Sequence, residues 1–132
     1  MTTFVLAVAA LLAAPAPAPA TTILPGTWAN PSKSVHVAFK RCGQAMCGTI
    51  VWANAKAQAD ARRGGTNKLI GAVLFEKFVA ETPKRWRGAV FIPDIGQRVS
   101  GTITQENAKT IIGEGCLIAG LGCKSQRWSR IK

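Results

Sequence analysis

Short runs of β-branched and aromatic residues, separated by residues that favour turns, recur from residue 26 to the C-terminus. In the run SVHVAFK, at 34–40, apolar side chains take every second position, so Val37 and Phe39 face one side and His36 faces the other. This alternation is typical of a β-strand with one buried face. The other predicted strands are 26–28, 47–53, 69–78, 85–92, 97–105, 110–116 and 124–132. The chain is therefore expected to be all-β.

The predicted strands follow one another through mostly short connections, as in an up-and-down antiparallel meander. PDIG, at 93–96, has the residues of a tight turn. About eight such strands close most simply into a small β-barrel, because closure removes the exposed strand edges. A barrel of this size holds packed side chains or one small ligand, and a two-sheet sandwich is the alternative. Residues 54–63 carry no sizeable apolar face, so they are expected to form a connection with about one helical turn.

The N-terminal segment has the features of an export signal. Residues 4–14, FVLAVAALLAA, are unbroken apolar, and this stretch is shorter than the roughly 20 apolar residues that span a bilayer. PAPAPA follows at 15–20, and Ala18 and Ala20 fit an A-x-A cleavage pattern. We therefore predict a secretory signal peptide at 1–20, a single domain at 21–132, and a periplasmic or secreted location. A disordered Ala/Pro tail is the alternative.

The chain has four cysteines, all after the predicted signal: Cys42, Cys47, Cys116 and Cys123. An even number in a short exported chain favours two disulfides. Of the three possible connectivities we expect the local one, Cys42–Cys47 and Cys116–Cys123, in which each bond clips a turn and contributes about 2 kcal/mol. A redox pair or a zinc site is the alternative, although neither pair has the C-x-x-C spacing typical of those sites.

The formal charge is +11, from 17 Lys/Arg against 6 Asp/Glu, all after residue 20. A charge of this size attracts surfaces rich in phosphate or carboxylate, such as lipid head groups and acidic glycans. The basic residues are dispersed, without a run of five or six, so a basic disordered tail is not expected. Nucleic acid is not an expected partner either, because an exported protein seldom meets it. A solvated cationic surface that keeps the protein soluble is the alternative.

The sequence favours a protein that is not an enzyme. The single histidine, His36, is predicted to face outward, where a general base would not meet a ligand inside the barrel. The serines lack a nucleophile motif and no glycine-rich phosphate loop precedes a helix. No cofactor or metal is expected once the thiols are paired. The carboxylates are scattered over loops and turns: Asp60, Glu76, Glu81, Asp94, Glu106 and Glu114.

Several stretches together resemble one known family. They are GTW at 26–28, CGQAMCGTIVW at 42–52, LIGAVLF at 69–75, WRGAVFIPDIG at 86–96 and GCLIAGLGCKSQRWSRI at 115–131. In this order and spacing they resemble the DUF2147 family of small exported bacterial proteins. The resemblance covers nearly the whole chain after residue 20.

This resemblance implies a lipocalin-like, calycin-type barrel with an internal cavity for a small apolar or amphipathic ligand. Gly26 and Trp28 resemble the G-x-W motif on the first strand of lipocalins. In those proteins an arginine on the last strand packs over the tryptophan, and Arg127 or Arg130 is expected to take that part here.

The predicted function is non-catalytic binding of a small hydrophobic or amphipathic, fatty-acid-like molecule. Apolar side chains would bury the tail, and Arg87, Arg98 or Arg127 would pair with the head group. The predicted ligand-binding residues are Trp28, Val37, Phe39, Trp52, Phe75, Trp86, Phe91 and Arg127. Two alternatives stay open: the aromatic residues fill a packed core, or the cationic outer surface docks on anionic lipid, glycan or an acidic protein.

Overall fold

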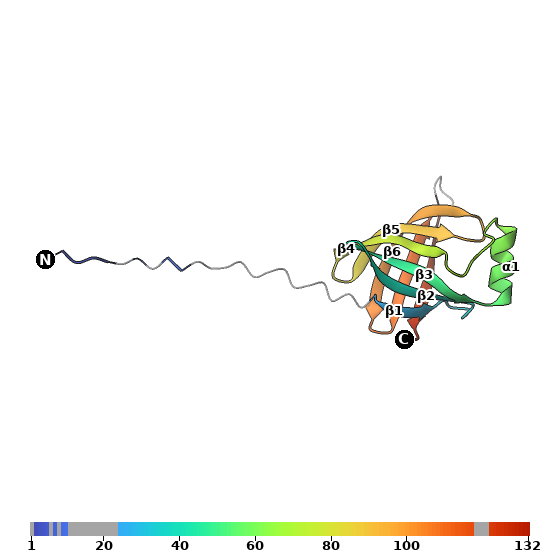
Figure 1. Cartoon of the computed structure of the whole chain (residues 1–132), viewed down its shortest axis with the longest axis horizontal. Coiled ribbons are helices and arrows are strands. Elements are labelled where there is room, and N and C mark those ends of the chain that lie inside the picture. The colour runs from blue at the N-terminus through green and yellow to red at the C-terminus, as the bar shows by residue number, and fades with distance from the viewer. Residues whose placement is uncertain (1, 6, 8, 11–23, 118–121) are drawn as a thin grey trace.

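Antiparallel pairing joins each strand to the next, and the first strand also pairs with the last, so the sheet closes into a barrel (Figure 1). The computed structural model describes residues 2–5, 7, 9–10, 24–117 and 122–132. The elements are β1 (Gly26–Ala29), β2 (Val35–Cys42), β3 (Ala45–Ala53), α1 (Ala55–Arg63), β4 (Val73–Thr82), β5 (Arg85–Ile92), β6 (Gln97–Asn107), β7 (Thr110–Cys116) and β8 (Cys123–Arg130). The all-β, eight-stranded, up-and-down barrel predicted from the sequence is confirmed, and the sandwich is excluded.

The predicted cleavage site at Ala18 and Ala20 lies outside the described residues. Within the part of the chain that the structure describes, no helix combines the length and the apolar character needed to cross a bilayer.

The helix α1 is longer than the sequence pattern predicted. It runs for nine residues, begins where the Asn54 side chain accepts a hydrogen bond from the Ala57 amide, and ends at Gly64. Only Ala61 on it is buried, so the helix has no wide apolar stripe for a periodicity argument to detect. The cap residues and the alanine content define it instead. The prediction of about one turn is therefore wrong in length.

The strand β4 begins at Val73, four residues later than predicted. Leu69 starts a turn in which the Ala72 amide donates to the Leu69 carbonyl at 3.0 Å, with Gly71 at a φ of 97°. Further along, Lys77 has a φ of 50° and the register with β5 shifts between Glu76 and Val79. This β-bulge adds one residue to the strand. As a result Phe75 and Phe78, three positions apart, are both buried.

The core of the barrel is built from large apolar side chains that pack over glycines. A Cβ at Gly48 would lie 2.8 Å from Val37 and 2.9 Å from both Phe39 and Phe75. Only glycine therefore lets these three side chains meet above β3. No polar or charged side chain is buried in the described part of the molecule.

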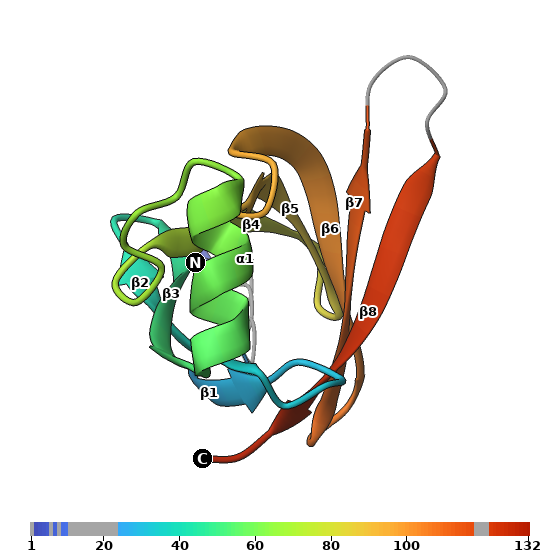
Figure 2. The same cartoon turned by 90° about the vertical axis from the view of Figure 1, so that its right-hand side faces the viewer.

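The barrel has two distinct ends. The closed end carries the turns β2–β3, β4–β5 and β6–β7, together with Leu24 before β1 and Lys132 after β8. The helix end carries the β1–β2 turn, α1, the β5–β6 turn, and the Cys116 end of β7 with the Cys123 end of β8. Figure 2 looks onto the helix end, with α1 lying across it and β7 and β8 to one side.

Both predicted disulfides are present, and they lie at opposite ends of the barrel. Cys42–Cys47 joins β2 to β3 at the closed end, and Cys116–Cys123 joins β7 to β8 at the helix end. The chain therefore has one clip at each end, and no described cysteine is free.

Candidate ligand-binding cavity

A cavity of about 820 Å³ opens at the helix end of the barrel. Its apolar wall includes Ile50, Leu69, Leu74, Phe75, Val90 and Trp128. Its polar rim includes Asn30, Ser32, Ser34, Asn54, Lys56, Asp60, Asp94, Lys124 and Gln126. The volume falls in the range of about 300–1,000 Å³ found for small-molecule pockets.

The space inside depends on glycines in β7. Gly113 and Gly115 both line the cavity, and their partners across the ladder on β8 are Gln126 and Lys124. A Cβ at Gly113 would lie 3.5 Å from the Trp128 indole nitrogen and 3.6 Å from Phe75, at ordinary contact distance. Between Gly113 and Gly115 the inner surface of β7 therefore carries no side chain, and this leaves part of the cavity volume.

Trp128 forms part of the cavity wall on β8. Its side chain is 3% exposed, and its ring meets the Phe75 ring edge-on with 5.6 Å between centroids. Its indole nitrogen makes no hydrogen bond to any residue that the structure describes. Gln126 and Lys124 precede it on the same face of the strand, because side chains on a strand alternate between its two faces. One inward face of β8 thus changes from aromatic to polar to cationic toward the rim.

The helix α1 is fixed to the rim at both ends. At its start, the Asn54 amide donates to the Ser34 carbonyl at 2.9 Å. After its end, the Thr66 hydroxyl donates to the Pro93 carbonyl at 2.9 Å. Gly64 lies so close to the Asp94 backbone that a Cβ there would clash. The helix is therefore tied to the β1–β2 turn on one side and to the β5–β6 turn on the other.

Asp60 on α1 is a rim carboxylate with two cationic neighbours. Lys56 Nζ donates to it at 2.8 Å, and Arg63 also contacts it. The Lys56 hydrogen bond is the main reason that the pKa of Asp60 is lowered, and the charges of Lys56 and Arg63 add to it against the upward effect of desolvation. Asp60 is therefore an ionised, paired carboxylate at neutral pH and not a proton donor.

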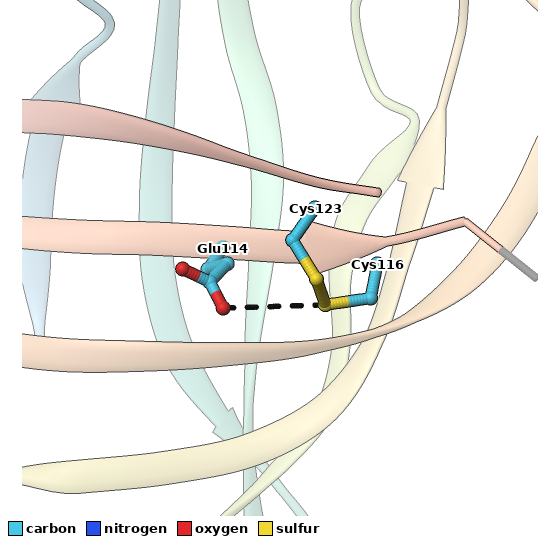
Figure 3. Close-up of a disulfide and its surroundings, with 3 residues drawn as sticks. All are labelled: Glu114, Cys116 and Cys123. Carbon is cyan, nitrogen blue, oxygen red and sulfur yellow. Dashed lines mark hydrogen bonds between the residues drawn. A yellow bond between two sulfur atoms is a disulfide. The ribbon is translucent and has the colours of Figure 1, made fainter. Parts of the chain in front are cut away.

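The second disulfide lies beside the Glu114 carboxylate at the end of β7 (Figure 3). Glu114 Oε1 is 4.0 Å from the Cys116 sulfur. Glu114, Cys116 and Cys123 are close enough to share a metal ion, but metal binding by cysteine needs the thiolate. With both sulfurs in the disulfide, only the carboxylate remains as a ligand.

Two of the eight predicted ligand-binding residues line the cavity. Phe75 lies in the wall, and Phe91 borders the rim with the Arg98 guanidinium 5.0 Å over its ring. Four others are buried in the core away from the cavity lining: Trp28, Val37, Phe39 and Trp86. The aromatic and apolar residues therefore divide between the two roles that the sequence left open, a cavity wall and a packed core.

Trp52 and Arg127 do not line the cavity. Trp52 is 42% exposed and stacks on His36 on the outer surface, with 4.5 Å between ring centroids. Arg127 pairs with Glu106 on the outer face, because its neighbour Trp128 points inward. These two placements correct the prediction.

The other arginines considered for the head group are also outside. Arg87 pairs with Glu81, and Arg98 pairs with Glu76 at 2.7 Å. The arginine that covers Trp28 is Arg130, whose guanidinium lies 4.3 Å over the ring. The lipocalin-type pair is therefore present, and of the two arginines proposed for it the structure selects Arg130.

The sequence-based list omitted Trp128, Ile50 and Leu74 from the wall, and Lys124 and Gln126 from the rim. A signal for these β8 residues was present in KSQRWSRIK, where Lys124, Gln126 and Trp128 take every second position, although Ser125 near the rim also lines the cavity. If Trp128 faces inward, alternation along the strand places Lys124 and Gln126 on the same face and Arg127 on the outer face.

The family model described as "Uncharacterized protein conserved in bacteria (DUF2147)" matches residues 26–130. The chain belongs to the DUF2147 family. The match spans all eight strands and α1, so the whole barrel is the DUF2147 unit. The resemblance seen in the sequence motifs is confirmed.

The DUF2147 barrel is also similar to a solved structure, protein HP1028 from the human pathogen Helicobacter pylori, which is described as belonging to the lipocalin family. The TM-score is 0.62 at 14% sequence identity, and the similarity covers 83% of each chain. At this identity the likeness concerns the fold, which is lipocalin-like. None of the curated proteins matches this DUF2147 sequence.

Proposed function

We propose that this barrel binds one small hydrophobic or amphipathic molecule in the cavity at its helix end and catalyses no reaction. The observation that supports this is the cavity itself, about 820 Å³ with an apolar wall and a polar rim. Burial of apolar ligand surface against such a wall contributes roughly 25 cal/mol per Å². The lipocalin-like fold is a setting in which pockets of this kind occur.

The rim suits the charged end of an amphiphile better than the interior does. No charged side chain is buried among the described residues, and an ionised group without a partner is costly to bury. A fatty-acid-like ligand would therefore place its tail against Phe75 and Trp128 and its carboxylate near Lys124. Lys124 replaces the arginines predicted from the sequence in this role.

The proposal that the barrel is not catalytic is supported by the surroundings of two titratable groups, His36 and Asp60. His36 stacks on Trp52 on the outer surface, away from the cavity. Asp60 on the rim is held ionised by Lys56 and Arg63. His36 is too far from the cavity to act on a molecule held there, and Asp60, ionised and paired with two cations, has no proton to donate as a general acid.

Native mass spectrometry of the protein purified from an exporting host tests the proposal. A co-purified mass of lipid size, or an adduct after incubation with decanoate and decane, is the expected result. Gly113→Leu should abolish the adduct by filling the cavity beside Trp128, and Ser129→Leu on the exposed outer face of β8 should leave it intact. A protein that stays free of ligand with every compound would refute the proposal.

We further propose export through a signal peptide at 1–20. Two disulfides clip a barrel of modest size, and disulfides persist in oxidising compartments. The exported protein should begin near Thr21 and should be four hydrogens lighter than its reduced form. Intact mass spectrometry measures both quantities, and an unprocessed N-terminus in the exported fraction would contradict the cleavage.

A second candidate function, docking on an anionic surface, is supported by the charge at the closed end. Lys40, Arg41, Lys84 and Lys109 lie in or beside its three turns, and none forms an ion pair with a described residue. The carboxylates nearest these turns, Glu81 and Glu106, are both paired with arginines. The closed end therefore presents uncompensated positive charge.

Co-sedimentation with vesicles containing anionic phospholipid distinguishes the two candidates. Docking should weaken steeply between low and physiological salt, whereas burial of an apolar ligand should not. Changing Lys40, Arg41 and Lys84 to Gln should reduce vesicle binding. The matched control changes Lys33, Arg62 and Lys68 at the helix end, and an equal loss from both variants would exclude a specific docking end.

A further inference from the structure

We infer that the indole N–H of Trp128 is a hydrogen-bond donor for the ligand, and that it selects molecules with an uncharged acceptor oxygen at their buried end. This inference rests on the proposed binding function and names the class of ligand. Ketones, esters, amides and alcohols with an apolar remainder belong to that class.

The first observation is the state of the donor. Trp128 is 3% exposed, yet its indole nitrogen has no hydrogen-bond partner among the residues described. Within the same residues, every fully buried side-chain nitrogen and oxygen has a partner. The Trp128 nitrogen must therefore reach accessible space, and Trp128 lines the cavity.

The second observation is the room beside this nitrogen. Gly113 lies two residues along β7 from Ile111, the ladder partner of Trp128, and even a Cβ added at Gly113 would stay 3.5 Å from the nitrogen. The backbone of β7 and the edge of the Phe75 ring surround this position. A ligand oxygen can thus approach to the roughly 2.9 Å of an N–H···O hydrogen bond without displacing a side chain.

The third observation fixes the charge of the acceptor. An indole offers one donor and no charge, and the described core holds no charged side chain. A carboxylate at this depth would lose its hydration for a single hydrogen bond, which is unfavourable. A neutral oxygen needs only one or two partners. The deep position is therefore suited to a carbonyl or hydroxyl oxygen, and the rim to a charged group.

The test compares three probes of equal chain length: 2-decanone, decane and decanoate. The wild-type protein should bind 2-decanone about three- to tenfold more tightly than decane, the range expected for one net hydrogen bond. Trp128→Phe should remove this preference and leave the affinity for decane within about twofold. The control Trp86→Phe, in the core away from the cavity lining, should keep the preference.

A second measurement covers the case in which Trp128→Phe does not fold. In a ¹⁵N–¹H spectrum of the wild-type protein, the Trp128 indole resonance should shift downfield with 2-decanone and much less with decane. An unchanged resonance would overturn the inference, as would equal affinities for the two probes. If none of the three probes binds, the proposed function itself fails. If they bind without a preference for the ketone, only the role of Trp128 fails.

Discussion

Trp28 and Trp128 lie on the neighbouring strands β1 and β8 and are both buried, but their surroundings differ. Trp28, at the closed end, is fully buried, donates its indole N–H to the Leu24 carbonyl at 3.0 Å, and lies beneath the Arg130 guanidinium. Trp128, in the cavity wall, has no described acceptor for its N–H. The indole N–H of Trp28 thus has an acceptor within the protein, whereas the indole N–H of Trp128 has none among the described residues.

The closed end gains its order from contacts between distant parts of the chain. Arg130 donates to the Pro25 carbonyl at 2.8 Å and to the Ala108 carbonyl at 3.0 Å. Gly26 leaves no room for a Cβ beside Arg130 and Lys132. The start of β1, the β6–β7 turn and the end of β8 therefore meet around one guanidinium. In the cavity, by contrast, Gly113 and Gly115 on β7 leave space beside the wall.

The largest effect should come from removing the buried tryptophan of the closed end. Trp28→Ala should lower the free energy of unfolding by about 3–5 kcal/mol, because it deletes a large core side chain and leaves a cavity. Urea denaturation measures the change. The matched control is Trp52→Ala on the outer surface, which should cost less than about 1 kcal/mol. Comparable losses at both positions would contradict the assigned locations.

The two disulfides should contribute similarly to stability and differ in where they act. Replacing Cys42 and Cys47 by Ser, or Cys116 and Cys123 by Ser, should each cost about 2 kcal/mol, since each bond closes a short loop. Hydrogen exchange should show faster opening of the β2–β3 turn in the first variant and of the β7–β8 pair in the second. If hydrogen exchange became faster throughout the barrel in either variant, the claim that each disulfide stabilises only its own end would be wrong.

A smaller effect is expected from Arg130. Arg130→Met should cost about 1 kcal/mol, because it removes the cation–π contact with Trp28 and the bonds to two carbonyls while keeping an apolar stem. Arg127→Met on the outer face breaks only an exposed ion pair and should cost between about 0 and 1 kcal/mol. Thermal unfolding of the two variants gives the ranking, and a more damaging Arg127→Met would reverse the assignment of the tryptophan-covering arginine.

The smallest effect concerns pH at the helix end. The pKa of Asp60 is lowered in the folded protein, chiefly by the Lys56 hydrogen bond, so its contribution to stability is present above the ordinary aspartate value of about 4. That contribution is lost as pH falls through the lowered pKa, where the folded protein takes up the proton. Asp60→Asn should therefore show a slightly lower Tm than wild type at pH 6 and the same difference should vanish near pH 2. A gap that widens on acidification would contradict the sign.

The strand order could be predicted from sequence because two-residue alternation is a local signal. Residues 97–105 and 110–116 show it clearly, and the structure has strands at Gln97–Asn107 and Thr110–Cys116. The predicted barrel followed from the number of strands and the short connections. The length of α1 could not be predicted in the same way, because its single buried residue, Ala61, gives no periodic pattern.

The cavity could not be predicted from sequence because it depends on register across strands. The space at Gly113 is bordered by Trp128 and Phe75, which come from two other strands. The residues next to Gly113 and Trp128 in the sequence do not specify that these side chains meet. The bulge at Lys77 similarly changes which residues of β4 face inward. Two placements that followed from simple alternation, His36 outward and Val37 inward, are confirmed.

The attachment of α1 at both ends has a consequence for the timing of exchange. If α1 were a lid hinged at one end, the ligand could bind only after the lid had opened, and association would be slow whatever the affinity. Here the Asn54–Ser34 and Thr66–Pro93 hydrogen bonds hold both ends of α1, so we expect the opening to the cavity to change little in width. A ligand must therefore be narrow enough to enter without movement of α1. Differences in affinity between ligands should then appear in the dissociation rate. Ligands that bind more tightly should dissociate more slowly, at nearly equal association rates.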